Sequence, residues 1–266
     1  MDKSTWAGLL LALGGIAAGL LLEGGNLSQI LQPTAALIVF GGTLGAVCIH
    51  FPLTAILGAG KQLGSVFLEP NWDSAQVVRT LVGFAQQARK EGIISLDPHL
   101  ERIRDPFMKK ALMLAVDGTE PGELRQMMEM ELDSREEHEE RFPQVFESAG
   151  GFAPTIGILG AVLGLIQVMQ HLDKLDEVGR GIAVAFVATI YGVGSANLFF
   201  LPCAGKLKLR IREEHLLRQM TLEGVIAILE GVNPRMLETK LRGFLAEAAA
   251  PPAPQRARAA GAGAGR

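Results

Sequence analysis

The stretch GFAPTIGILGAVLGLIQVMQ, residues 151–170, decides the fold of this chain because it contains no Asp, Glu, Lys or Arg. An α-helix rises about 1.5 Å per residue, so a segment of this length can cross the roughly 30 Å of hydrocarbon in a bilayer. Each charged side chain at the bilayer centre costs at least about 2.5 kcal/mol, and this segment carries none. We therefore predict a transmembrane helix here.

Three more stretches share this property, at residues 5–22, 34–53 and 181–203. With 48% hydrophobic and 20% charged residues among 266, the chain is more apolar than a typical soluble protein. A soluble protein would need to bury four charge-free runs of membrane length. The sequence instead predicts an all-α, polytopic membrane protein with four transmembrane helices in two hairpins and a helical cytosolic domain between them.

Basic residues indicate the orientation of the four segments, because short loops rich in Lys and Arg stay in the cytosol. The connector 23–33 has no Lys or Arg, and the connector 171–180 balances Lys174 and Arg180 against three acidic residues. We therefore expect both connectors outside and both termini in the cytosol. The basic residues gather between the second and third segments and directly after the fourth, at Arg79, Arg89, Lys90, Arg102, Arg104, Lys109, Lys110, Lys206, Lys208, Arg210 and Arg212.

Composition divides the chain into five parts. Residues 1–53 and 149–205 are the predicted transmembrane hairpins, and residues 54–148 are the predicted cytosolic domain. Residues 206–248 continue as cytosolic helices after the fourth span. Residues 249–266 contain almost only Ala, Gly, Pro and Arg, so they have little apolar surface to bury and we expect a disordered tail.

The cytosolic domain shows helical periodicity interrupted by turn signals, with no sustained alternation typical of strands. One helix is expected at residues 106–117, where Gly118 provides a stop signal. A separate, strongly charged helix is expected at residues 123–141, with a polar face in solvent or against a partner.

Composition and spacing argue against several classes of function. The formal net charge is -3 at pH 7, with no broad basic face, so nucleic acid is not an expected partner. The five histidines show no metal-ligand spacing, and no nucleophile and base form a recognisable motif. We therefore predict that the chain is not an enzyme and holds neither a metal nor a cofactor.

The four spans also lack a carboxylate, although proteins that carry protons or cations across a bilayer usually place an ionisable group at membrane depth. If ions cross here, a partner must supply that carboxylate. The hydroxyls of Thr155, Thr189 and Tyr191 could line a polar path beside such a partner. A hydroxyl in a membrane helix can instead bond its own backbone, and the sequence leaves both possibilities open.

Glycine pairs at four-residue spacing occur in three of the spans. Such spacing lets helix backbones approach closely, although glycine is also simply frequent in membrane helices. Three pairs together favour a tight helical assembly. The pairs are Gly15 and Gly19, Gly41 and Gly45, and Gly160 and Gly164.

Four regions carry a resemblance to a known family. Residues 153–165 read APTIGILGAVLGL, residues 189–202 contain TIYG and NLFFLP, residues 88–97 read ARKEGIISLD, and residues 230–235 read EGVNPR. Together they resemble the flagellar stator family MotA/PomA, which belongs to the MotA/TolQ/ExbB proton channels. The resemblance keeps the same order from the first residues to about Leu245.

This resemblance implies a homo-oligomeric ring in the inner membrane of a bacterium, surrounded by lipid. The ring would enclose a second protein, MotB or PomB, whose single transmembrane Asp binds the ion. Ion flow, worth about 2.3 kcal/mol per charge per 100 mV, would then turn the rotor protein FliG. The missing carboxylate in the spans agrees with this division of roles.

The resemblance also assigns roles to individual residues. Pro154 and Pro202 match two prolines that flank the pore helices, where a missing N–H permits a bend, although each could instead mark a helix end. Arg89, Lys90 and Asp97 fall at the rotor-contacting positions. The alternatives are a solvated surface charge for Arg89 and a helix N-cap for Asp97.

The third span also bears on the identity of the ion. Sodium-driven members of this family tend to carry a threonine where this chain has Ala161, whose methyl group offers no oxygen to replace the hydration of Na⁺. Thr189, the matching hydroxyl of the fourth span, is retained and does not discriminate. We therefore predict protons.

Two other functions remain as alternatives. An energiser of the ExbB or TolQ type would couple protons to envelope transport, but such proteins usually have three spans, and the first hairpin argues against that function. A membrane scaffold without ion flux would suit the charge-free spans equally well. An adjacent gene for a single-span protein with a membrane Asp and a peptidoglycan-binding domain would favour the stator.

Overall fold

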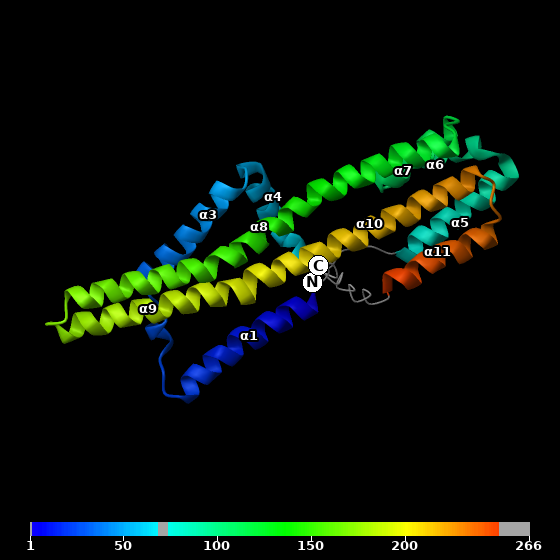
Figure 1. The fold of residues 1–266 in the computed structure, drawn as a ribbon. Helices are drawn as coiled ribbons and strands as arrows, with labels where there is room; N and C mark the ends of the chain where they lie inside the picture. The colour runs from blue at the N-terminus through cyan, green and yellow to red at the C-terminus, as the bar shows by residue number, and fades with distance from the viewer. Residues whose placement is uncertain (1, 69–73, 250–266) are drawn as a thin grey trace, which may run out of the picture. The chain divides into compact units, whose positions relative to one another are not determined.

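The computed structural model describes residues 2–68 and 74–249, and these residues form helices and turns without a β-strand (Figure 1). The fold divides into two compact units. A membrane unit comprises Met1–Trp72 and Met130–His215, and a second unit comprises Asp73–Glu129 and Leu216–Arg266. The predicted disordered tail lies, beyond Ala249, outside the described residues.

The first hairpin contains two of the four helices that are long and apolar enough to cross a membrane. Helix α1 spans Lys3–Leu22, and the 3-10 turn η1 spans Leu27–Gln29. The second span then runs without a break through α2 (Pro33–Ala36), the π-helical turn η2 (Leu37–Gly41) and α3 (Gly42–His50).

The second span ends three residues earlier than predicted. Phe51 is extended, with φ -122° and ψ 148°, and Pro52 stands directly before α4 (Leu53–Phe67). The residue before a proline is pushed out of the helical region, which explains the end of the span at His50. Helix α4 packs on the rest of the membrane unit through an apolar cluster that includes Ala55, Ala59, Val66, Val145, Phe146 and Leu207.

The third span is part of a 50-residue helix, α8 (Pro121–Gln170). We expected a separate charged helix at 123–141, and that expectation is wrong, because α8 continues through Pro143 and Pro154. A proline removes one backbone hydrogen bond, and long helices tolerate it where their other bonds and their packing hold them together. Pro154 therefore does not mark a helix end.

The fourth span runs through three consecutive elements, α9 (Leu175–Ser195), the π-helical turn η4 (Ala196–Phe200) and α10 (Leu201–Leu229). Pro202 lies inside this continuous run, so it does not mark a helix end either. The expected helical continuation after residue 206 is present, because α10 extends to Leu229.

Small residues join the third and fourth spans. A Cβ atom at Gly157 would lie 2.9 Å from the carbonyl oxygen of Ala188, and one at Gly164 would lie 2.8 Å from that of Gly181. A Cβ atom at Gly160 would lie 2.8 Å from the Cβ atom of Ala188, so the predicted close approach at Gly160 and Gly164 is confirmed. The other two glycine pairs, at 15 and 19 and at 41 and 45, have open space around them in this chain.

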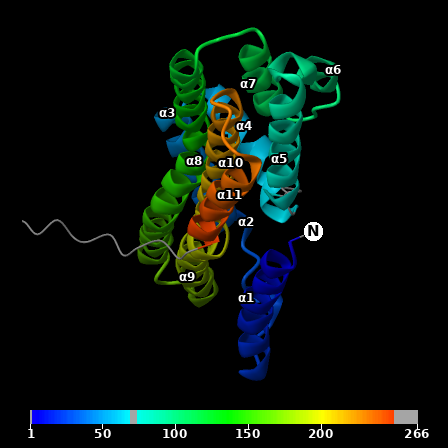
Figure 2. The ribbon, with the colours of Figure 1, turned by 90° about the vertical axis from the view of Figure 1, so that its right-hand side faces the viewer.

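The second unit is a helical bundle that contains residues 73–129 of the expected helical domain together with the helices after residue 216. Helices α5 and α11 lie side by side in it (Figure 2), and Leu81 of α5 contacts Gly224 of α10. Its fully buried side chains include Leu81, Leu112, Leu124, Met128, Leu237 and Leu241. The elements of this unit besides parts of α8 and α10 are α5 (Ser74–Glu91), η3 (Ile93–Leu96), α6 (Asp97–Leu100), α7 (Pro106–Val116) and α11 (Pro234–Ala249).

Candidate functional site: the third and fourth spans

The third and fourth spans each have a buried face and an open face. The buried faces meet at the glycine contacts described above. The open face of α9 carries Phe186 and Val193, which are 69% and 45% exposed within this chain, and Thr189 lies between them. On α8, Pro154 and Ala161 are half-buried beside exposed residues such as Ile158 and Leu165, which are 59% and 51% exposed. An apolar surface of this kind suits a partner helix or lipid.

The two threonines of this region bond their own helices. Thr155 Oγ1 donates to the carbonyl oxygen of Phe152 at 2.8 Å, and Thr189 Oγ1 donates to that of Ala185 at 3.2 Å. The backbone-bonding alternative therefore describes both side chains in this structure. Each hydroxyl oxygen still has lone pairs with which it can accept a hydrogen bond.

The Tyr191 side chain contacts the first hairpin of its own chain. Its hydroxyl donates to the Ile30 carbonyl at 2.6 Å and accepts from the Gln32 N–H at 3.3 Å. Its ring stacks on Phe40 with centroids 5.7 Å apart. These contacts fasten the connector of the first hairpin to the fourth span.

The regular α-helical hydrogen bonding of the fourth span is interrupted around residues 196–202. The turn η4 has π-helical hydrogen bonding, and Pro202 has no N–H to donate to the preceding turn. Asn197 Nδ2 donates to the Val193 carbonyl at 2.9 Å. The helix is continuous at residues 196–202, but its regular α-helical hydrogen bonding is interrupted there. We call these residues the α9–α10 break, because a helix bends most easily where its hydrogen-bond ladder is interrupted.

The three predicted rotor-contacting residues share an exposed corner of the second unit. Arg89 and Lys90 lie in the last turn of α5, and Asp97 begins α6 after the left-handed residue Gly92, whose φ is 84°. All three side chains are exposed, and no ion pair within the described residues engages them. Leu96 is the N-cap residue of α6, so the alternative role of Asp97 as N-cap is wrong.

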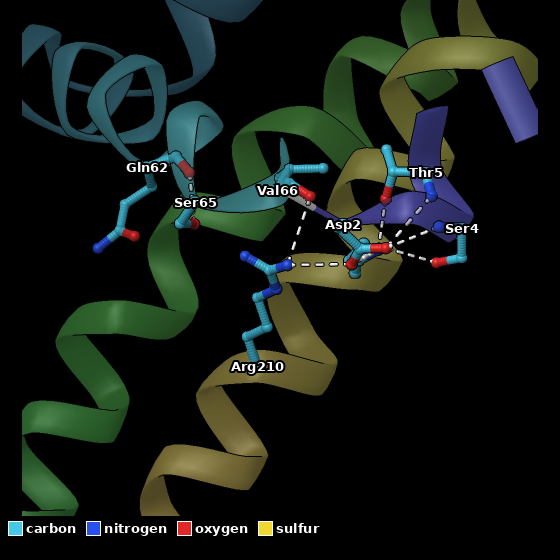
Figure 3. A network of polar contacts seen from close by, with 8 residues as sticks. Asp2, Ser4, Thr5, Gln62, Ser65, Val66 and Arg210 are labelled. Atoms are coloured by element: carbon cyan, nitrogen blue, oxygen red, sulfur yellow. Dashed lines mark hydrogen bonds and ion pairs between the residues drawn. The ribbon is translucent and has the colours of Figure 1, made fainter. Parts of the chain in front are cut away.

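A cluster of charges that sequence reasoning missed surrounds Asp2 (Figure 3). The Asp2 carboxylate caps α1 by accepting from the N–H groups of Ser4 and Thr5, at 3.1 and 3.3 Å. It also pairs with Lys206 and with Arg210, whose Nη2 lies 3.2 Å away. The hydrogen bond from Lys206 is the main cause that holds the pKa of Asp2 well below its usual range. Only the capping role could be foreseen, from an Asp directly before an apolar run.

A second cluster holds helices of the second unit together. Glu223 of α10 pairs with Arg125 of α8 and accepts from Lys240 Nζ of α11 at 2.7 Å. The Arg125 hydrogen bond is the main cause that lowers the pKa of Glu223, and Glu223 in turn raises the pKa of Arg125. The sequence gives no local signal for this cluster, because its members are 98 and 17 residues apart.

Comparison with known proteins finds two families along this chain. Residues 99–220 match the MotA/TolQ/ExbB proton channel family, and residues 6–92 match the family described as Motility protein A N-terminal. Motility protein A of Bacillus subtilis is 36% identical over 246 residues, which cover 92% of this chain and 91% of that protein.

Two solved structures share the fold. A chain of C. jejuni MotAB superposes with a TM-score of 0.88 at 33% identity, covering 92% of this chain and 96% of that one. A chain of the flagellar MotAB stator complex from Bacillus subtilis gives a TM-score of 0.84 at 35% identity, covering 91% and 96%. The likeness therefore extends over both hairpins and the second unit.

Proposed function

Because this chain belongs to the MotA/TolQ/ExbB proton channel family, we propose that it is a stator subunit of a bacterial flagellar motor. The observation that carries the proposal is the match over about nine-tenths of the chain to relatives named for motility and for the MotAB stator. The family is one of channel and motor components, and we propose no catalysis for this chain.

The partner in this proposal is a MotB-like protein with one transmembrane helix. Four charge-free spans cannot hold an ion at membrane depth by themselves, so the partner supplies the carboxylate. Several copies of this chain surround the partner, with lipid outside. The wall of the ion pathway is assigned to Pro154, Thr155, Ala161, Thr189 and Pro202, and Tyr191 supports that wall by holding the first hairpin to the fourth span.

The multi-pass chain lies in the inner membrane. With both termini cytosolic, the second unit faces the rotor, and its exposed Arg89, Lys90 and Asp97 contact FliG through charge. Separated surface charges suit this role, because they attract a moving partner over about 8–10 Å without holding it permanently. Ala161 offers no oxygen to a sodium ion, so protons drive the motor.

A complementation assay tests the function and the ion together. The chain and the single-span partner from its own genome are produced in a swimming bacterium that lacks both of its stator proteins. We expect swimming that is restored without added sodium and that stops when a protonophore collapses the proton gradient. The chain with the partner's membrane Asp replaced by Asn is the control, and it restores no swimming.

Two results would contradict the proposal. Swimming that depends on sodium and survives the protonophore would reject the assignment of the ion. Absence of swimming, combined with recovery of proton-dependent envelope transport in a strain without ExbB or TolQ, would favour the energiser. The match of residues 6–92 to the motility family argues against that second function, because it covers the first hairpin.

A further inference from the structure

The Asp2 cluster joins three elements that are far apart in the sequence. Asp2 precedes α1, Lys206 and Arg210 belong to α10, and Arg210 Nη2 also donates to the Val66 carbonyl of α4 at 3.4 Å (Figure 3). The Asp2 N–H donates to the Phe67 carbonyl of α4 at 3.1 Å. One carboxylate therefore fixes the start of the first span to the exit of the fourth.

Apolar packing within the chain cannot replace this attachment. Helix α1 has no buried residue over its 20 positions, so few apolar contacts hold it. Near its start, Trp6 contacts the ring of Phe67 with centroids 5.5 Å apart. The polar contacts of Asp2 and Lys206, including the bond from Lys206 to Thr5 Oγ1, therefore set where α1 is held at its cytosolic end.

The cluster is sheltered enough to be strong. The side chains of Asp2, Lys206 and Arg210 are 16%, 24% and 13% exposed. One carboxylate serves two cations there, so its removal leaves two sheltered positive charges facing each other without a counter-ion. Breaking a sheltered pair in this way is far more disruptive than losing an ion pair in open solvent.

The position of the Asp2 cluster along the fourth span determines which part of that helix the cluster holds. Lys206 lies one helical turn after Pro202, so the cluster begins just beyond the α9–α10 break. A cavity of about 390 Å³ lies beside the break and reaches the cluster, because it is lined by Gly8 and Ala12 of α1, by Asn197 and Pro202 of the fourth span, and by Thr5 and Lys206. The polar contacts of Lys206 and Arg210 hold the fourth span after the break, whereas the space between α1 and the break is open.

We propose that Asp2, together with Lys206 and Arg210, forms a clamp that makes the fourth span bend at the α9–α10 break when ions pass. Asp2 is a positioning residue in this proposal, because it acts through α10 and touches neither the ion nor the partner. The clamp keeps α1, α4 and the start of α10 together as one body. Motion of the pore wall then moves this body and is not lost by separation of α1 from α10.

This inference rests on the proposed stator function, so the test first requires that the wild-type chain with its partner restores swimming. The variants are Asp2→Asn, Asp2→Glu, Arg210→Gln and the double variant Asp2→Asn with Arg210→Gln. Lys3→Gln is the matched control, because Lys3 is an exposed charge at the same end of α1. For each variant, the amount of protein in the membrane, the swimming speed and proton uptake by membrane vesicles are measured.

We expect Asp2→Asn to reach the membrane at the wild-type level and to keep proton uptake, while swimming speed per unit of uptake falls at least about twofold. Asp2→Glu should restore most of this ratio, because it keeps the charge, and Lys3→Gln should not change it. Arg210→Gln should lower the ratio less than Asp2→Asn does, because it leaves the pair of Asp2 with Lys206 in place. The double variant should be no worse than Asp2→Asn alone, because that single variant has already lost the pair with Arg210.

Three results would overturn the clamp. The first is a ratio of swimming speed to proton uptake in Asp2→Asn that equals the ratio in the wild type. The second is a double variant in which the two effects multiply, because the residues would then act independently. The third is a parallel fall of protein amount, uptake and swimming, which would limit the cluster to folding. If the wild type itself does not swim, the proposed function fails and the clamp fails with it.

Discussion

At Gly192 the α9 backbone passes so close to α8 that a Cβ atom would lie 2.5 Å from the carbonyl oxygen of Ala153. Neither of these backbones can yield as a flexible side chain would. We expect Gly192→Ala to destabilise the helical hairpin by about 1–3 kcal/mol, the usual cost of overpacking, and to lower the midpoint of thermal unfolding of the purified protein. Gly194→Ala is the matched control, because a Cβ atom there meets nothing within 4 Å. Equal midpoints for the two variants would contradict the close contact.

The charges at the corner between α5 and α6 are a second feature at the scale of single residues. Arg89 and Asp97 are exposed and lack partners among the described residues, so reversing either charge should not disturb folding. We expect Arg89→Asp and Asp97→Lys to reduce motor torque severalfold, because like charges then face each other across the rotor contact. The measurements are bead rotation and the amount of protein in the membrane.

Arg104→Asp provides a control for the rotor contact, because Arg104 is an exposed cation of the same unit outside the assigned trio. It should leave torque unchanged. Normal torque in both Arg89→Asp and Asp97→Lys would remove these residues from the rotor contact. An equal loss of torque in Arg104→Asp would mean that torque depends on the net charge of the unit and not on a specific contact made by Arg89 and Asp97.

Among the elements of the second unit, Glu223 connects α8, α10 and α11 through its two cationic partners. Its pKa is lowered in the folded state, so it stabilises the fold above its unfolded pKa of about 4.3 and loses this contribution as pH falls through the folded value. We expect Glu223→Gln to lower the free energy of unfolding by about 1–2 kcal/mol near neutral pH, because the Glu223 side chain is only 18% exposed.

The measurement is the midpoint of thermal unfolding at pH 7 and below pH 4. The difference between wild type and Glu223→Gln should shrink at the lower pH, where the wild-type carboxylate becomes protonated. Glu238→Gln is the control, because its partner Arg242 is 71% exposed and their pair spans one helical turn. Its effect should stay below about 0.5 kcal/mol. A difference for Glu223→Gln that does not depend on pH would contradict the charge-based explanation.

Some of the helices could be predicted from the sequence alone, and others could not. The four spans could be predicted because each lacks charges over a membrane-crossing length, a property of consecutive residues. The continuity of α8 through Pro143 and Pro154 could not be predicted, because a proline inside a helix removes a backbone hydrogen bond and predicts a break. The helix continues only where packing against other helices compensates for that lost bond. That compensation depends on contacts between residues far apart, such as Gly192 with Ala153.

The parts of the candidate site differ in the same way. Arg89 and Asp97 could be found because they stand in a short motif, whereas the pairing of Asp2 with Lys206 joins residues 204 apart, by the difference of their numbers. For Thr155 and Thr189 the sequence allows both pathway lining and backbone bonding, and the three-dimensional structure shows the backbone bonds. Sequence patterns therefore located the spans and the charged corner, and the fold was needed to see the attachments between helices.

For the whole molecule, the open apolar face of the fourth span predicts where the partner lies. A surface that carries Phe186 and Val193 is covered in an assembly either by the single span of the partner or by lipid. If Thr189 belongs to the wall of the pathway, cysteines at 186, 189 and 193 should cross-link to cysteines placed along the partner's span. Cysteines at Val187 and Ala188 should not, because these positions are 5% and 0% exposed within the chain.

The experiment starts from a chain with Cys48 and Cys203 replaced by Ala, so that every cross-link comes from an introduced thiol. Membranes from swimming cells are oxidised and the cross-linked pairs are separated by size. Because a helix repeats every 3.6 residues or so, true contact gives strong cross-links at positions three to four apart and weak ones between them. Equal cross-linking at all five positions would indicate random collision. Cross-links restricted to 187 and 188 would mean that α8 and α9 open in the assembly, and the pathway wall assigned to Thr189 would then be wrong.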